Sequence, residues 1–326
     1  MNHWLLSAAL LSVFLATGSQ ADRIRLALAQ TELRLYPSAG DYAAHMARQM
    51  QAAMATQPDL VVFPEDIGLP LVLVDDYAVV KDCRTTRQAI VSLVRAHAAE
   101  VNPLTDQGMT VSQALLRFKS FRTQALYRKT FGGLARRHGV YVAAGSAPLP
   151  WQGKVANASY LFSPTGEVVG TVGKAHLVPL EGPEGLGLQP VTGQRPWQTP
   201  WGKLSMIICA DAWDAELAAS HRSQGARLLL NCLANPEPWS EAQQAGMDGG
   251  SLPARVAETG LPGAQCYAVG GLFDLRFHGK SQLLRALPGN KWEALARAQT
   301  ANKEEIVAGE LDLAVSDSQP IDGDTP

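Results

Sequence analysis

The stretch Ser205–Trp213 reads SMIICADAW. Its first half is an apolar run typical of a buried strand, and the run stops at Cys209, directly before Ala210 and Asp211. Cysteine is among the residue types that are buried most often, so Cys209 could be one more small core side chain. The alternative is that the strand holds a thiol at its end. The two interpretations are separated by what the rest of the chain contains.

The composition of the 326-residue chain is that of a globular protein, with 46% hydrophobic and 18% charged residues. This length suits one large α/β domain, or at most two smaller ones. A net charge of −2 and the lack of any basic run give no electrostatic reason to expect a nucleic acid or an anionic membrane as partner. We therefore expect a small-molecule or acyl substrate.

Residues 1–21 are predicted to be a signal peptide. Trp4–Thr17 is an uncharged apolar run that is short for a bilayer span, and Ser19-Gln20-Ala21 offers small residues at the −3 and −1 positions of a cleavage site. Charged residues begin at Asp22. We expect a periplasmic or secreted protein with no stable membrane partner, or a membrane-anchored one where the signal stays uncleaved.

Export would place the cysteines that follow this segment in an oxidising compartment. Cys232 and Cys266 lie in apolar runs typical of core strands, where a free buried cysteine is expected, and a Cys232–Cys266 disulfide is the alternative. The wide spacing of the cysteines forms no compact disulfide framework. No Cys-x-x-Cys pair or histidine cluster predicts a metal site, and we expect no cofactor.

Apolar runs alternate with helical patterns along the chain, which predicts a layered α/β domain. The expected strands are Ile24–Leu33, Asp59–Pro64, Val140–Ser146, Ala158–Phe162, Val168–Gly173, Leu204–Cys209, Arg227–Leu233 and Gln265–Gly271. The expected helices are Asp41–Ala55, Gln124–His138 and Asp214–Gln224, with Asp41 and Asp214 as N-caps and Gly139 closing the second helix. Ser163–Gly166 predicts a tight turn between antiparallel strands.

Residues 75–122 interrupt this alternation. They carry helical patterns at Gln88–Ala99 and Ser112–Phe121, separated by a polar turn at Asn102-Pro103. Such a helical insertion is either a lid over a site or a peripheral pair of helices. At the other end of the chain, the polar, Pro- and Gly-containing tail at 316–326 is predicted to be disordered.

Two further apolar runs end in a reactive side chain. Glu65 follows the run Leu60–Pro64, and Lys174 follows the run that ends at Gly173. A single glutamate or lysine at such a place is usually a solvated surface group. Side chains at strand ends of an open α/β sheet can, however, converge on one crevice, so Glu65, Lys174 and Cys209 define a chemistry together.

The chemistry is attack on a carbonyl carbon. A cysteine attacks as thiolate, and its ordinary pKa near 8.5 means that a base must take the proton. The Glu65 carboxylate could act as that base if desolvation raises its basicity. The Lys174 ammonium would then stabilise the negative oxygen of the tetrahedral intermediate. These three groups supply base, electrostatic stabiliser and nucleophile without a histidine.

In this order the three runs resemble the motifs of the nitrilase, or carbon–nitrogen hydrolase, superfamily. Val62–Glu65 (VFPE) is similar to its glutamate motif, Gly173–Leu177 (GKAHL) to its lysine motif and Ile208–Asp211 (ICAD) to its cysteine motif. Asp211–Trp213 (DAW) is similar to the variant found in glutamine-amide-hydrolysing domains. The resemblance covers roughly residues 24–313.

The resemblance implies a four-layer α-β-β-α sandwich, which we bound at residues 22–315, and pairing of two copies into a homodimer. Within it, the helical insertion at 75–122 would overhang the pocket. The implied reaction is attack by Cys209 on a small-molecule amide or nitrile, with Glu65 as general base and Lys174 as catalytic cation. The backbone N–H of Ala210 would help to hold the oxyanion, and water would resolve the thioester.

The family often has a second glutamate that orients substrate or water. Glu181 is our choice for it, and Glu184 is the alternative because the register after the lysine motif is ambiguous. Ala210 and Cys266 stand where bulkier or acidic residues and asparagine, respectively, are frequent, which leaves the substrate class open. Trp213 either lines the pocket or packs elsewhere.

We therefore expect an exported amide hydrolase with a thiol nucleophile. Acyl transfer from the same thioester is one alternative, and a non-catalytic binding protein on the same scaffold is another. Asp211 is expected to accept hydrogen bonds at the end of a loop or helix, and His176 to brace the lysine loop.

Overall fold

The computed structural model describes residues 22–313, which form strands, α-helices and short 3-10 helices. The strands are β1 (Arg23–Leu33), β2 (Leu60–Val62), β3 (Tyr141–Ala143), β4 (Ala147–Trp151), β5 (Lys154–Phe162), β6 (Val168–Gly173), β7 (Trp197–Thr199), β8 (Gly202–Ile208), β9 (Ala226–Leu233), β10 (Gly263–Leu272), β11 (Leu275–Phe277), β12 (Gln282–Leu287), β13 (Lys291–Arg297) and β14 (Glu305–Asp312). The α-helices are α1 (Ala39–Met54), α2 (Tyr77–Val80), α3 (Thr86–Ala96), α4 (Ala98–Thr105), α5 (Val111–His138), α6 (Ala215–Ser223), α7 (Glu241–Gly250) and α8 (Leu252–Thr259). Short 3-10 helices lie at η1 (Leu69–Val72), η2 (Val74–Asp76) and η3 (Cys209–Trp213).

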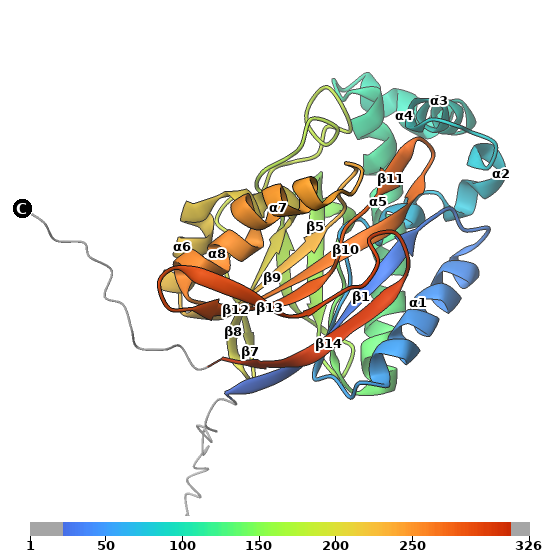
Figure 1. The fold of residues 1–326 in the computed structure, drawn as a ribbon. Helices are drawn as coiled ribbons and strands as arrows, with labels where there is room; N and C mark the ends of the chain where they lie inside the picture. The colour runs from blue at the N-terminus through green and yellow to red at the C-terminus, as the bar shows by residue number, and fades with distance from the viewer. Residues whose placement is uncertain (1–21, 314–326) are drawn as a thin grey trace, which may run out of the picture.

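Successive side chains of a strand point to opposite faces of the sheet, and the packing on these faces gives four layers (Figure 1). In β2, Val61 packs in a cluster with residues of α1 and α5, whereas Leu60 and Val62 face the opposite way. The cluster on that opposite side joins β1 and β2 to β8 and β9, so it lies between two halves of a curled sheet. In β8, Ile207 points away from this inner cluster, toward α6 and α8. The layer order is therefore helix, sheet, sheet, helix, which confirms the predicted sandwich.

The sheet topology brings several strand ends to one edge. The strands follow the order β4-β5-β3-β2-β1-β10-β9-β8-β7, and β2, β1, β10, β9 and β8 run parallel to one another. β6 is antiparallel to β5, and β5 is antiparallel to β3, which is parallel to β2. β2, β6 and β8 therefore share a direction, and their carboxyl ends lie at the same edge of the sheet.

Each of the eight predicted strands overlaps an observed one, and Gly139 closes α5 with a φ of 67° as predicted. The N-cap assigned to Asp41 is wrong, because Ser38 caps α1 and accepts a hydrogen bond from the Asp41 N–H. The patterns predicted as two helices around Phe121 form the single helix α5, since nothing in the connecting residues breaks a helix.

The predicted turn at Asn102-Pro103 is also wrong, because α4 continues through Pro103. The carbonyl of Ala99 that loses its partner to the proline is on an exposed residue, where water can satisfy it. Helices α2, α3 and α4 gather at one end of the sandwich, beside the first half of α5 (Figure 1). Between residues 22 and 313, no helix is both long and apolar enough to cross a membrane. The predicted signal peptide and tail lie outside the described residues.

Candidate active site

The three strand-end side chains meet at the shared edge of the sheet. Lys174 directly follows β6, Cys209 directly follows β8, and Glu65 follows β2 after a short extended segment. The Lys174 Nζ lies 2.8 Å from Glu65 Oε1, and the Cys209 thiol lies close enough to the Glu65 carboxylate for that charge to raise the pKa of the thiol. An acid and an ammonium that are remote in sequence are therefore in direct contact, with the sulfur beside them.

The Glu65 carboxylate is held by three donors. Its Oε1 accepts hydrogen bonds from Lys174 and from Asn157 Nδ2 at 3.0 Å, and its Oε2 accepts one from the backbone N–H of Ala234 at 2.8 Å. The residue is 2% exposed. These contacts fix both oxygens, so the carboxylate cannot turn away from the thiol.

A second carboxylate, Glu181, completes the environment of the ammonium. Its Oε2 lies 2.6 Å from Lys174 Nζ and accepts a hydrogen bond from the Val178 N–H, while its Oε1 accepts one from Asn157 at 2.7 Å. The Asn157 amide thus joins the two carboxylates. Glu184, the alternative for this position, is exposed and makes no such contact among residues 22–313.

The backbone at Cys209 is unusual. Its φ is 49°, in the left-handed region that non-glycine residues rarely adopt, and its N–H donates to Asn231 Oδ1 at 3.0 Å. This turn separates the strand from η3 and leaves Cys209 partly exposed. The next residue, Ala210, lies in the first turn of η3, where backbone N–H groups have no acceptor within the helix. Backbone strain of this kind is often found at functional positions.

Electrostatics keep the resting thiol neutral. Burial raises the pKa of Cys209 well above its ordinary value, and the neighbouring Glu65 charge raises it further. Burial also raises the pKa of Glu65, while the Lys174 ammonium partly opposes this. Burial alone would lower the pKa of Lys174, but the charges of Glu65 and Glu181 outweigh it and raise that pKa. The lysine is thus a permanent cation beside a carboxylate with raised basicity.

Asp211 links the turn that carries Cys209 to the loop that carries Lys174. Its Oδ1 accepts hydrogen bonds from the backbone N–H groups of Ala175 and His176, at 3.0 and 2.8 Å. Its Oδ2 accepts bonds from the Ile208 N–H and from Gln194 Nε2. The Asp211 side chain is fully buried, and the His176 ring contacts it. Both residues therefore have the bracing contacts that were expected of them.

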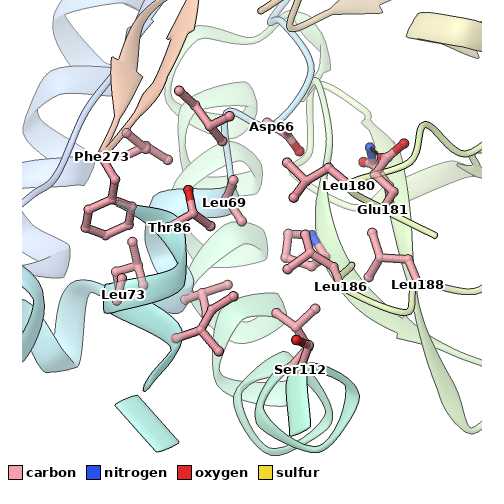
Figure 2. A pocket seen from close by; sticks show the side chains of 18 of the residues that line it. Asp66, Leu69, Leu73, Thr86, Ser112, Leu180, Glu181, Leu186, Leu188 and Phe273 are labelled. Atoms are coloured by element: carbon pink, nitrogen blue, oxygen red, sulfur yellow. Dashed lines mark hydrogen bonds between the residues drawn. The ribbon is translucent and has the colours of Figure 1, made fainter. Parts of the chain in front are cut away.

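An apolar cavity of about 120 Å³ opens beside the two glutamates (Figure 2). Glu65, Lys174 and Glu181 contribute to one part of its lining. In Figure 2, Leu69, Leu180 and Leu186 surround the space. Helix α3 of the insertion also contributes to the wall. The insertion thus borders the cavity, as a lid would.

Some site residues were not found by sequence reasoning, and two predicted ones, Glu184 and Trp213, make none of the contacts described above. Asn157 and Asn231 were not predicted to have site roles, because their importance depends on which backbone and side-chain groups the fold brings to them. Trp213, one alternative for the pocket lining, instead lies over Gly250 of α7 with 52% of its surface exposed. In the described part of the chain, no group of His, Cys, Asp and Glu side chains is arranged to hold a metal.

Replacing Lys174 with methionine is expected to lower the free energy of unfolding by about 3–5 kcal/mol, because two buried carboxylates lose their counter-charge. Lys174 is 1% exposed and contacts both Glu65 and Glu181. Urea denaturation at neutral pH measures the effect, with the exposed Lys154→Met as matched control. Without Lys174 to oppose it, burial would hold the pKa of Glu65 above that of the unfolded chain, so the deficit should shrink as the pH falls toward about 5. A denaturation midpoint equal to that of the wild type would contradict this electrostatic account.

Comparisons with known proteins agree with this arrangement. A sequence profile described as "Carbon-nitrogen hydrolase" matches residues 25–320. The chain is 31% identical over 121 residues to "Omega-amidase NIT2" of Danio rerio, a match that covers 34% of this chain and 44% of that protein. It is 28% identical over 182 residues to "2-oxoglutaramate amidase" of Bacillus subtilis, covering 56% of this chain and 66% of that protein. The matches thus span about half to two thirds of these relatives.

Solved structures share the fold at lower sequence identity. A carbon–nitrogen hydrolase from Helicobacter pylori G27 aligns with a TM-score of 0.63 and 20% identity over 90% of each chain. Nit3 of Saccharomyces cerevisiae, described as a member of the nitrilase superfamily, aligns with a TM-score of 0.62 and 22% identity over 91% of this chain and 92% of that one. The resemblance seen in the motifs is confirmed, and the chain belongs to the carbon–nitrogen hydrolase family.

Proposed function

We propose that this protein hydrolyses the carbon–nitrogen bond of small amides through a thioester on Cys209. The single observation that carries the proposal is that the Glu65 carboxylate is ion-paired with the Lys174 ammonium and lies beside the Cys209 thiol. The names of two relatives, an omega-amidase and a 2-oxoglutaramate amidase, are consistent with an amide as substrate.

In the first half-reaction, Glu65 takes the thiol proton as the sulfur forms a bond with the amide carbonyl carbon. Lys174, together with the Ala210 N–H, stabilises the resulting oxyanion. Glu65 then gives the proton to the amide nitrogen, the carbon–nitrogen bond breaks, and ammonia or an amine leaves. The acyl group stays on Cys209 as a thioester.

In the second half-reaction, Glu65 takes a proton from a water molecule, which attacks the thioester carbon. The carbon–sulfur bond breaks, the carboxylic acid leaves, and the proton returns to the sulfur. Glu181 contacts Lys174, which supports a role for it in orienting that lysine and the attacking water. If an amine outcompetes water at this stage the protein is an acyltransferase, the alternative that uses the same thioester.

Ammonia release from a panel of primary amides tests the proposal. Turnover that stays the same when hydroxylamine is added supports hydrolysis, whereas formation of hydroxamate in place of acid supports acyl transfer. A protein that binds amides but releases no ammonia or hydroxamate would favour a non-catalytic role on this scaffold.

We further propose that the protein works outside the cytoplasm. The support is the apolar run at 4–17 and the small residues at 19 and 21, followed by the start of the profile match at residue 25. N-terminal sequencing of the protein recovered from expressing cells tests this, since a mature chain starting at Asp22 supports export and an intact Met1 contradicts cleavage.

A further inference from the structure

The charges around the apolar cavity restrict what it can bind. Three carboxyl groups contribute to its lining, on Glu65, Asp66 and Glu181. Among the described lining residues, Lys174 supplies the only cation, and it is already paired with Glu65 and Glu181. Burial next to these groups also raises the pKa of Asp66 well above its ordinary value. An anionic ligand group would meet the charges of the two glutamates and would find no unpaired cation among the described lining residues.

Apart from the Asn157 amide, most of the rest of the wall is hydrocarbon. Helix α3 contributes Ala89, Ile90 and Leu93, and the loop after the lysine motif contributes Leu180, Leu186 and Leu188. Hydroxyl groups enter the lining only at Thr86 and Ser112. A wall of this kind stabilises aliphatic groups by removing them from water and offers almost nothing to polar groups.

Resting on the proposed amide hydrolysis, we propose that this cavity selects uncharged amides with an aliphatic acyl chain and rejects acyl chains that end in a carboxylate. The volume of the cavity limits the length of the acyl chain. An apolar protein cavity of roughly 150 Å³ takes benzene. The cavity of about 120 Å³ therefore fits an acyl chain of about four to six carbons.

This specificity would separate the protein from a relative that it resembles in sequence. The name of the Bacillus subtilis relative contains 2-oxoglutaramate, an anion whose acyl chain ends in a carboxylate, and such chains are the ones we expect this cavity to reject. A carboxylate buried in the cavity would lose its hydration next to the two glutamates, with no unpaired cation among the described lining residues to replace the water. A terminal methyl group at the same place would gain from burial instead.

Steady-state kinetics with five primary amides test the proposal: acetamide, butyramide, hexanamide, decanamide and succinamate. We expect kcat/KM to rise about fourfold per methylene from acetamide to hexanamide and to fall at decanamide, which exceeds the cavity. Succinamate differs from butyramide only in a carboxylate in place of the terminal methyl, and we expect its kcat/KM to be at least about tenfold lower. Equal kcat/KM values for acetamide and hexanamide, or a preference for succinamate, would overturn the proposal.

Two variants on α3 test whether this wall of the cavity causes the chain-length preference. Ile90 contributes to the cavity wall, whereas its neighbour Val91 is 41% exposed and outside that wall. Ile90→Phe should reduce kcat/KM for hexanamide at least about tenfold more than for acetamide, because the ring occupies the volume of the chain. Val91→Phe should leave both values unchanged. Identical chain-length profiles in Ile90→Phe and wild type would contradict the assignment of this wall.

Calorimetric titration of the Cys209→Ala variant with hexanamide, acetamide and succinamate measures binding without turnover, so it tests the specificity independently of the reaction. Hexanamide binding more tightly than acetamide and succinamate, in a protein whose wild type releases no ammonia, would support the cavity and contradict the proposed hydrolysis. Hydrolysis of all five amides without chain-length preference would support the proposed function and contradict the cavity. Equal binding of the three ligands to the variant would overturn the specificity whatever the turnover.

Discussion

Replacing Cys209 with alanine is expected to lower kcat for any amide substrate by at least about 10⁴-fold, because no other group can form the thioester. The small, partly exposed side chain is replaced by another small one, so the fold should remain intact. The hydrogen bond from the residue 209 N–H to Asn231 does not depend on the side chain and would keep the turn in place. Ammonia release and the circular dichroism spectrum measure the two effects.

The matched control is Cys83→Ala. Cys83 is also free and partly buried, but it lies before α3 and contacts Ser92 and not the site. Its replacement should leave kcat unchanged. Retained turnover in Cys209→Ala, with a wild-type spectrum, would remove Cys209 as nucleophile.

Replacing Glu65 with glutamine is expected to reduce kcat by about 10²–10⁴-fold, the range that a positioned general base supplies. The amide matches the carboxylate in shape, so Lys174 and Asn157 retain an oxygen to donate to. Its NH₂ group then meets the Ala234 N–H, donor against donor, which should also lower the free energy of unfolding by about 1–3 kcal/mol. Turnover measured with hexanamide, together with urea denaturation, tests both parts.

Glu184→Gln serves as the control for Glu65→Gln. Glu184 is exposed and lies outside the cavity lining, so the same chemical change there should alter neither kcat nor stability. Full activity in Glu65→Gln would exclude Glu65 as the base and leave the neutral thiol unexplained.

The strand ends could be predicted from sequence because their signal is local. An apolar run that stops at a charged or nucleophilic residue marks both a buried strand and the place where it leaves the sheet, as at Glu65, Lys174 and Cys209. The order of the three runs matched one known family, and that resemblance predicted the four-layer sandwich. The alternation of Leu60, Val61 and Val62 between two clusters follows from the period of a strand alone.

The C-terminal strands escaped prediction because they carry little hydrophobic pattern. β13 (Lys291–Arg297) has no buried residue, and β14 (Glu305–Asp312) has polar residues at both ends. β14 is held by its antiparallel register with β1, and β13 by its register with β12. Pairing of this kind depends on backbone groups distant in sequence, which composition does not reveal.

The local sequence also could not decide which of Glu181 and Glu184 is the second glutamate of the site. The two glutamates lie on one short loop, and which of them reaches Lys174 depends on how that loop turns. The Val178 N–H fixes Glu181 by donating a hydrogen bond to its carboxylate. The apolar cavity was similarly hidden, because its wall combines α3, α5 and the loop at 178–188, which the sequence separates by many residues.

Intact-mass analysis of the protein, quenched during turnover of hexanamide, tests the central claim most directly. The account predicts one added hexanoyl group in place of the thiol hydrogen, located by peptide mapping on Cys209, and no such addition in Cys209→Ala. Ammonia release with no acyl adduct in rapidly quenched samples, or an adduct on Cys83, Cys232 or Cys266, would contradict it.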